Sequence, residues 1–75
     1  MTAKITTARE LGELIRTVRK QQGLTQVQLA ALCGVSPRFV GELEGGRASA
    51  GIGRVFRVCA RLGLDLMVEQ RGEAR

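Results

Sequence analysis

Apolar residues recur at the spacing of an α-helix in four separate stretches of this chain. The first stretch begins at the capping box Thr7-Ala-Arg-Glu10 and ends at Gly23. Its apolar positions, which follow the pattern i, i+3, i+4 and i+7, are Leu11, Leu14, Ile15 and Val18. We expect a helix here that buries this face and leaves its charged residues exposed.

Two shorter helices are predicted next, separated by a very short connection. The first begins at the capping box Thr25-Gln-Val-Gln28 and ends at Gly34. The second begins at Ser36-Pro37, because serine caps a helix start and proline fits the first helical position, and Gly45-Gly46 stops it. The connection Gly34-Val35 is too short for antiparallel packing and favours the steep crossing of a helix-turn-helix unit.

A fourth helix and one short strand complete the pattern. The apolar face expected for this helix consists of Ile52, Val55, Phe56, Cys59 and Leu62, and Gly63 closes it. Residues 64–69 then alternate, with Leu64, Leu66 and Val68 on one side, as in a half-buried β-strand. An isolated strand leaves its backbone amides and carbonyls unpaired, and the chain offers no second candidate. We therefore expect the segment to pair with itself across a homodimer; the alternative is a coil over its own core.

These elements form one domain without repeats or linkers, with a core at 7–63, a dimerisation strand at 64–69 and a frayed tail at 70–75. The predicted fold class is all-α, with four or five helices and the short C-terminal strand. A chain of 75 residues has a thin stability margin, to which dimerisation can add.

The charge of the chain favours a polyanionic partner. Twelve Lys and Arg residues against seven Asp and Glu give a formal charge of +5, so nucleic acid is the first expectation and an anionic membrane surface the second. No apolar run approaches the roughly 20 residues that span a bilayer, and the N-terminus lacks the features of a signal peptide. We expect a cytoplasmic protein with no membrane partner.

The residue inventory argues against catalysis and metal binding. The chain has no histidine, and its two cysteines, Cys33 and Cys59, continue apolar patterns, which favours core packing over a disulfide or a zinc site. No nucleophile–base pair occurs, and Gly45-Gly46 lacks the sequence context of a phosphate-binding loop. We therefore expect no enzyme, no metal and no cofactor.

The N-terminal end of the third predicted helix is the candidate recognition surface for DNA. Such helices push this end into the major groove, and the positions expected to contact bases there are Ser36, Pro37, Arg38, Phe39 and Glu42. Arg38 can donate two hydrogen bonds to guanine. Phe39 is expected to face outward against a thymine methyl group, with core packing as the alternative, and Glu42 can repel a phosphate or accept from cytosine.

Three further positions complete the candidate site. Gln26, in the first turn of the second helix, and Arg47, just beyond the third, are expected to contact phosphates. Glu44 lies at the C-terminal end of the third helix, where a negative charge opposes the helix dipole and calls for a compensating partner. Arg19 is the proposed partner; the alternative is a surface carboxylate of little energetic consequence.

The segment LTQVQLAALCGVSPRFVGELEGGR resembles the TQxxLAxxxGVSxxxVxxLExG pattern of the lambda-repressor-like (XRE/Cro) helix-turn-helix family. The resemblance spans about residues 11–64. It implies a phosphate contact for Gln26, base contacts for the residues from Ser36 to Phe39, and a structural ion pair between Arg19 and Glu44. The short chain and the ending RVFRVCARLGLDLMV resemble HipB-like antitoxins of toxin–antitoxin operons.

The narrower resemblance implies a homodimeric repressor that autoregulates its operon, binds an inverted-repeat operator in double-stranded DNA and binds a HipA-like serine/threonine kinase toxin. One alternative is a stand-alone XRE-type regulator, phage-like or housekeeping. Another is a protein-interaction module that does not bind DNA. Gly41 and Glu42 depart from the polar uncharged residues that many relatives carry in the recognition helix, so the operator sequence does not transfer.

Overall fold

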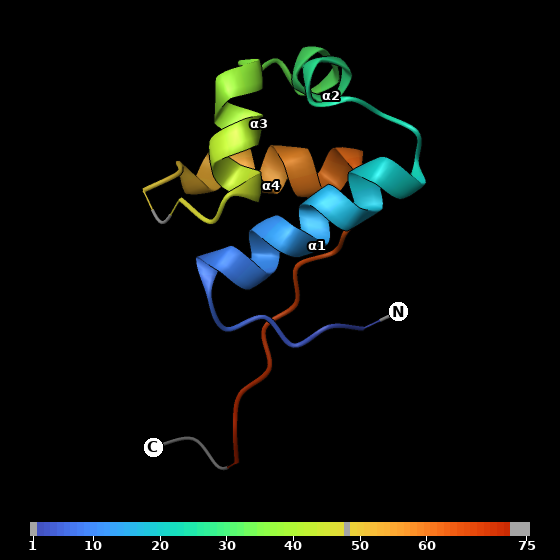
Figure 1. Ribbon diagram of the computed structural model, residues 1–75. Helices are drawn as coiled ribbons and strands as arrows, with labels where there is room; N and C mark the ends of the chain where they lie inside the picture. Colours follow the sequence, from blue (N-terminus) through green and yellow to red (C-terminus); the bar gives the residue numbers. More distant parts are fainter. Residues whose placement is uncertain (1, 48, 73–75) are drawn as a thin grey trace.

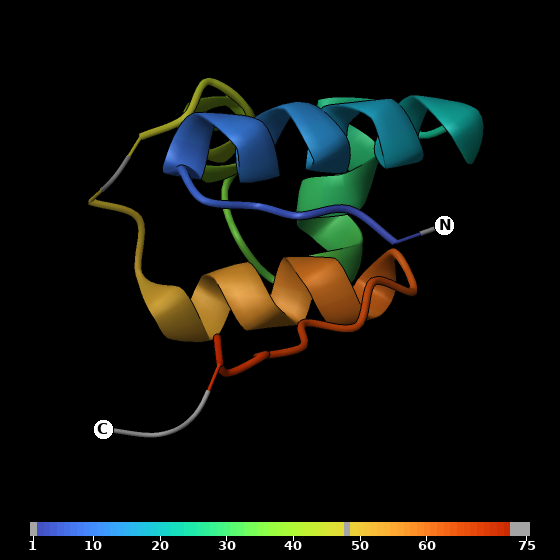
Figure 2. The same ribbon diagram turned by 90° about the horizontal axis from the view of Figure 1, so that it is seen from below.

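The computed structural model describes residues 2–47 and 49–72, and the described residues form four α-helices. The helices are α1 (Ala8–Gln21), α2 (Gln26–Cys33), α3 (Pro37–Glu44) and α4 (Ile52–Arg61). In Figure 1, α1 and α4 run in the same direction and α3 stands across them, with α2 at the upper end of α3. The view from below in Figure 2 shows α1 and α4 roughly parallel, with α2 between them at one end. The all-α prediction is confirmed.

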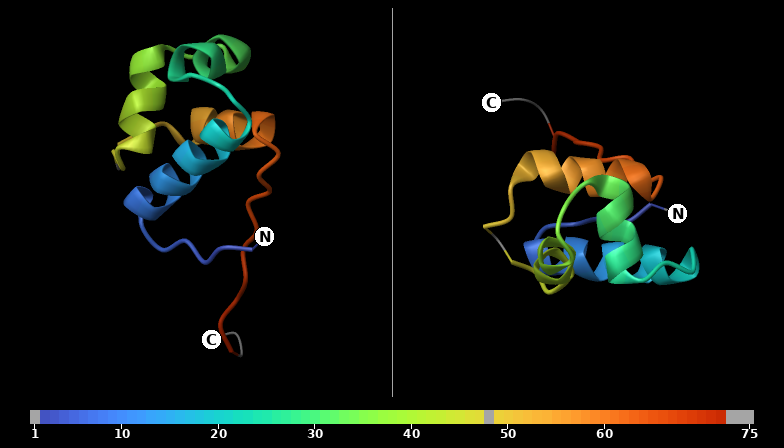
Figure 3. Two further views of the ribbon diagram at one scale, coloured as in Figure 1. Left: turned by 45° about the vertical axis from the view of Figure 1, so that its right-hand side comes forward. Right: turned by 90° about the horizontal axis from the view of Figure 1, so that it is seen from above.

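Local hydrogen bonds start three of the helices where the sequence predicts. The amides of Glu10 and Gln28 donate to the hydroxyls of Thr7 and Thr25 at 3.1 and 3.0 Å, and both capping boxes are complete. Ser36 accepts from the third amide along, at 3.0 Å, to cap α3. Gly34 ends α2 in the left-handed conformation, with φ of 68°, so α3 can leave steeply, as both views of Figure 3 show.

The predicted inner face of α4 is partly wrong. Val55, Cys59 and Leu62 are buried as expected, but the fourth buried position is Val58, whereas Ile52 and Phe56 are exposed. Both sets fit helical spacing, because α4 is apolar around more than one stripe. Only packing against the other helices decides which stripe is covered.

The two phenylalanines have exchanged the environments predicted for them. Phe39, expected to face outward, is only 8% exposed, and Phe56, expected in the core, is 52% exposed. Phe39 lies beside Val40 in the buried face of α3, and the guanidinium carbon of Arg54 stands 5.0 Å from the centre of its ring. The outward orientation of Phe39 is therefore corrected. Its ring joins α3 to α4.

A glycine allows α1 to cross the end of α3 at backbone contact. A Cβ atom at Gly12 would overlap the carbonyl oxygen of Leu43 and lie 2.7 Å from that of Glu44. No side chain fits there without moving one of the two helices. This crossing fixes where α1 places its outward-facing residues relative to α3.

The segment after α4 is irregular in this single chain. Leu64 packs against the core, whereas Leu66, Met67 and Val68 are exposed, and no strand is assigned among residues 64–72. The predicted strand pairing across a dimer is not seen and stays a prediction. Residues 70–72 of the predicted frayed tail are exposed and lack helix or strand, and residues 73–75 lie outside the described part.

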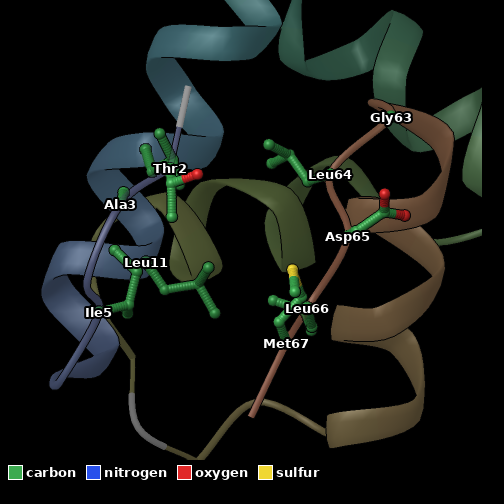
Figure 4. A pocket seen from close by; sticks show the side chains of 10 residues that line it. Thr2, Ala3, Ile5, Leu11, Gly63, Leu64, Asp65, Leu66 and Met67 are labelled. Atoms are coloured by element: carbon green, nitrogen blue, oxygen red, sulfur yellow. The ribbon is translucent and has the colours of Figure 1, made fainter. Parts of the chain in front are cut away.

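A pocket of about 310 Å³ lies between the two terminal segments, on one side of α1. Figure 4 shows its side chains, among them Ile5 from the N-terminal segment, Leu11 from α1, and Leu64 and Leu66 from the C-terminal segment. Its lining is largely apolar.

None of the described helices is long and apolar enough to cross a membrane.

Candidate nucleic-acid interface

The first turn of α3 is an exposed, positively charged helix start. Ser36 and Pro37 are exposed, and Ser36 uses its hydroxyl for the cap. The side chain of Arg38 is 84% exposed and projects from the helix surface. The dipole of α3 adds partial positive charge at the same end. This turn therefore presents hydrogen-bond donors and positive charge, a combination that attracts nucleic acid.

Glu42 joins this surface through two ion pairs. Its Oε2 atom accepts from Nε of Arg38 at 3.2 Å, one helical turn away, and lies 3.4 Å from Nη2 of Arg47. The Glu42 side chain is 36% exposed. The structure therefore brings together three predicted site residues, two as cations and one as the anion between them.

At the other end of α3, Arg19 and Glu44 form a separate, buried ion pair. Nε of Arg19 donates to Oε2 of Glu44 at 2.6 Å, and Nη2 donates to Oε1 at 3.0 Å. The side chains are 8% and 3% exposed. The remaining nitrogen of the guanidinium donates to the carbonyl of Leu24 at 2.7 Å, just before α2. The pair therefore ties α1, the start of α2 and the end of α3 together.

Gln26 completes this buried cluster. Its Nε2 donates to Oε1 of Glu44 at 3.0 Å. Burial by itself would raise the pKa of Glu44, but the hydrogen bonds from Arg19 and Gln26 and the charges of Arg19 and Arg16 outweigh it, so the pKa is lowered. The bond to Glu44 raises the pKa of Arg19 against the effect of its burial. Both groups therefore stay charged.

An open notch of about 410 Å³ lies over this cluster, between α1, α2 and α3. Its lining residues are Arg16, Arg19, Gln26, Gly41, Glu44 and Gly45. Arg16 was not among the predicted site residues, although its place one helical turn before Arg19 could have suggested it. Gln26, one of the two predicted phosphate contacts, lines the notch itself, and Gly45 on its rim is two residues before the other, Arg47, in sequence.

The remaining predicted residues lie apart from this surface. Phe39 is in the core, as described, and the two cysteines are buried free thiols whose pKa is raised by that burial. Leu66 and Val68 lie beyond α4 in the C-terminal segment. The structure thus gathers the polar candidates around α3 and leaves the apolar dimerisation candidates elsewhere.

Sequence comparison connects this arrangement to known proteins. The family model described as Helix-turn-helix matches residues 15–67. An uncharacterized HTH-type transcriptional regulator, y4mF of Sinorhizobium fredii, is 41% identical over 75 residues, which cover 100% of this chain and 99% of the relative. The match includes the elements that carry the ion pairs of Glu42 and Glu44.

Structural comparison gives the same architecture. A chain of a HipA-HipB-O2-O3 complex superposes with a TM-score of 0.85 at 22% identity, covering 95% of this chain and 100% of that one. The clp gene regulator ClgR from C. glutamicum superposes with a TM-score of 0.69 at 32% identity, covering 83% and 80%. The restriction-modification controller protein C.AhdI from Aeromonas hydrophila gives 0.70 at 26%, covering 77% and 88%.

Proposed function

The chain belongs to the helix-turn-helix family of XRE type, and on that premise we propose that it is a homodimeric, sequence-specific repressor of transcription. The observation that carries the proposal is the first turn of α3, where the exposed guanidinium of Arg38 stands at a capped helix start. The hydrogen bonds of Arg19 to Glu44 and to the carbonyl of Leu24 join α1, the start of α2 and the end of α3. This junction supports a recognition helix held at a fixed angle. Ser36 and Pro37 lie beside Arg38 and are proposed to approach the same base edges.

Three residues around α3 are proposed to bind the DNA backbone. Gln26 stands in the first turn of α2, whose free amides favour an anion, and Arg47 follows the end of α3. Arg16 lines the same notch as Gln26 and adds a positive charge there. Gln26→Ala is expected to weaken binding to all sequences evenly, because phosphate contacts carry no base information.

The C-terminal segment is proposed to form the dimer by antiparallel strand pairing. Leu66, Met67 and Val68 expose apolar side chains, the first two at the pocket of Figure 4, and a second chain would cover part of them. Such a two-fold axis would hold two copies of α3 in successive major grooves, so the operator is expected to be an inverted repeat with half-sites about 34 Å apart.

A matched pair of variants tests this dimer. In a strand, Val68 and Met67 point to opposite faces, so Val68→Asp should disrupt the predicted inner face while Met67→Asp leaves it intact. We expect the first variant to sediment as a monomer that binds the operator weakly, and the second to remain a dimer. Equal behaviour of the two variants would contradict strand pairing. A chain ended after Gly63 that remained a dimer with full affinity would contradict it too.

We propose further that the protein is the HipB-like antitoxin of a toxin–antitoxin operon, with a HipA-like kinase as its partner. The full-length match to the chain of a HipA-HipB complex supports this proposal. A stand-alone regulator is the second candidate, favoured by the higher identity to the clp gene regulator ClgR. Co-purification of the tagged chain with the products of its own operon separates them. A kinase in the complex supports the antitoxin, and its absence when the adjacent genes are expressed supports the stand-alone regulator.

DNA binding itself is tested by gel shift with a random duplex library at several salt concentrations. The proposal expects salt-sensitive binding and enrichment of an inverted repeat. No binding to any duplex, even at low salt, would instead indicate a protein-interaction module.

A further inference from the structure

We propose that Glu42 is a specificity-determining residue that positions Arg38 for guanine and restrains both arginines from non-specific phosphate binding. This inference rests on the proposed DNA-binding function. It gives Glu42 a different role from a direct contact to a base.

The first support is the atom of Arg38 that Glu42 engages. The carboxylate accepts from Nε, at 3.2 Å, rather than from either terminal nitrogen. The two terminal nitrogens form the end of the guanidinium, and they are left free to donate as a fork to the two acceptors on the major-groove edge of guanine. Glu42 therefore holds the side chain in a way that leaves its base-contacting end available.

The second support is the exposure of Arg38. With 84% of its side chain accessible, little in the protein fixes its rotamer apart from this contact. A long side chain that is mobile before binding loses conformational entropy when it becomes ordered on DNA. The contact with Glu42 orders the Arg38 side chain before binding, so less conformational entropy is lost when Arg38 binds DNA in that rotamer.

The third support is the second cation on the same oxygen. Nη2 of Arg47 lies 3.4 Å from Oε2 of Glu42, so one carboxylate faces two arginines and leaves the group with a single net positive charge. Non-specific binding depends on the number of phosphates that cations neutralise. Glu42 therefore lowers the attraction of this surface for any DNA while it favours one orientation of Arg38.

Two substitutions at this position separate length from charge. Glu42→Gln keeps the length of the side chain but removes its charge, and Glu42→Asp keeps the charge but shortens the reach to Nε. Selection from a random duplex library gives the preferred sequence of the wild-type protein and the base preference at the position that depends on Arg38. A duplex of unrelated sequence, titrated at several salt concentrations, gives the non-specific affinity.

Glu42→Gln is expected to lower preference at that base pair by about two- to five-fold, the range of an exposed ion pair, and to raise non-specific affinity. Its salt dependence should steepen by up to about one phosphate equivalent. Glu42→Asp should lower the same base preference but leave the non-specific affinity unchanged, because it keeps the negative charge. In an Arg38→Ala background, Glu42→Gln should no longer change base preference, because the side chain it positions is gone.

Unchanged base preference in Glu42→Gln would overturn the proposal, as would an equal change in the Arg38→Ala background. Circular dichroism and melting of each variant check the fold, and Glu13→Gln, in the exposed Arg9–Glu13 pair of α1, is the control for the loss of one negative charge. If the wild-type protein shows no salt-sensitive binding, the proposed function fails. If it binds selectively while Glu42→Gln behaves as wild type, only the role of Glu42 fails.

Discussion

The two ends of α3 carry the same pair of residue types in opposite surroundings. Arg19 and Glu44 are buried and joined by two hydrogen bonds, whereas Arg38 and Glu42 are joined by a single longer one on an exposed surface. Breaking a buried pair strands a charge in a poorly solvated place, while an exposed pair contributes at most about 1 kcal/mol. An arginine–glutamate pair therefore fixes the position of α3 at its buried end. At the exposed end, where DNA is expected to bind, the same kind of pair can be rearranged at little cost.

The largest effect is expected at the buried end. Arg19→Ala should destabilise the fold by about 3 to 5 kcal/mol, because it leaves the Glu44 carboxylate buried without its cation. For a domain of this size the melting temperature should fall by about 10 °C or more, measured at one protein concentration. Arg61→Ala, at the exposed end of α4, is the control and should change little. An unchanged melting temperature in Arg19→Ala would show that the pair does not hold α1 and α3 together.

A smaller loss is expected where α1 crosses α3. Gly12→Ala places a methyl group against the carbonyl oxygens of Leu43 and Glu44, which should cost about 1 to 3 kcal/mol despite the better helix propensity of alanine. Gly53→Ala in α4 is the matched control, because its Cβ would meet nothing within 4 Å, and it should stabilise by up to about 1 kcal/mol. Chemical denaturation measures both. Equal effects at the two glycines would mean that the helix crossing is not tight.

The contribution of the buried pair should also depend on pH. The pKa of Glu44 in the folded protein lies below its ordinary value of 4.5, so its stabilising effect is complete above that pH and is lost as the pH falls through the folded-state pKa. Glu44→Gln lacks this titration. The difference in unfolding free energy between the two proteins should therefore be constant near neutrality and shrink in acid. A difference that stays constant down to strongly acidic pH would contradict the lowered pKa.

The sequence predicts the helix starts well because they depend on contacts within four residues. Thr7 with Glu10, Thr25 with Gln28, and Ser36 with Pro37 each specify a cap that needs nothing from the rest of the fold. The steep turn at Gly34 follows from the same local chemistry.

Features that depend on the packing of one helix against another were predicted less well. Val58 and Phe56 compete for the inside of α4 at equally good helical spacing, and only packing against the other helices, α2 in particular, decides between them. Gly12 gives no signal in its own helix, because its partner is a backbone 31 residues later in sequence. The spacing of Arg38 and Glu42 was visible beforehand, but it could not tell which nitrogen the carboxylate would engage.

Arg38 is proposed to read bases, whereas the buried pair of Arg19 and Glu44 holds α3 in place without touching DNA. The most direct test measures Arg38→Ala twice, by melting and by titration of the selected operator at fixed salt. We expect a melting temperature close to that of the wild type, operator affinity weakened by about 1 to 3 kcal/mol, and relaxed preference at one base pair in each half-site. An Arg38→Ala protein that keeps both its affinity and its sequence preference would contradict this role of Arg38.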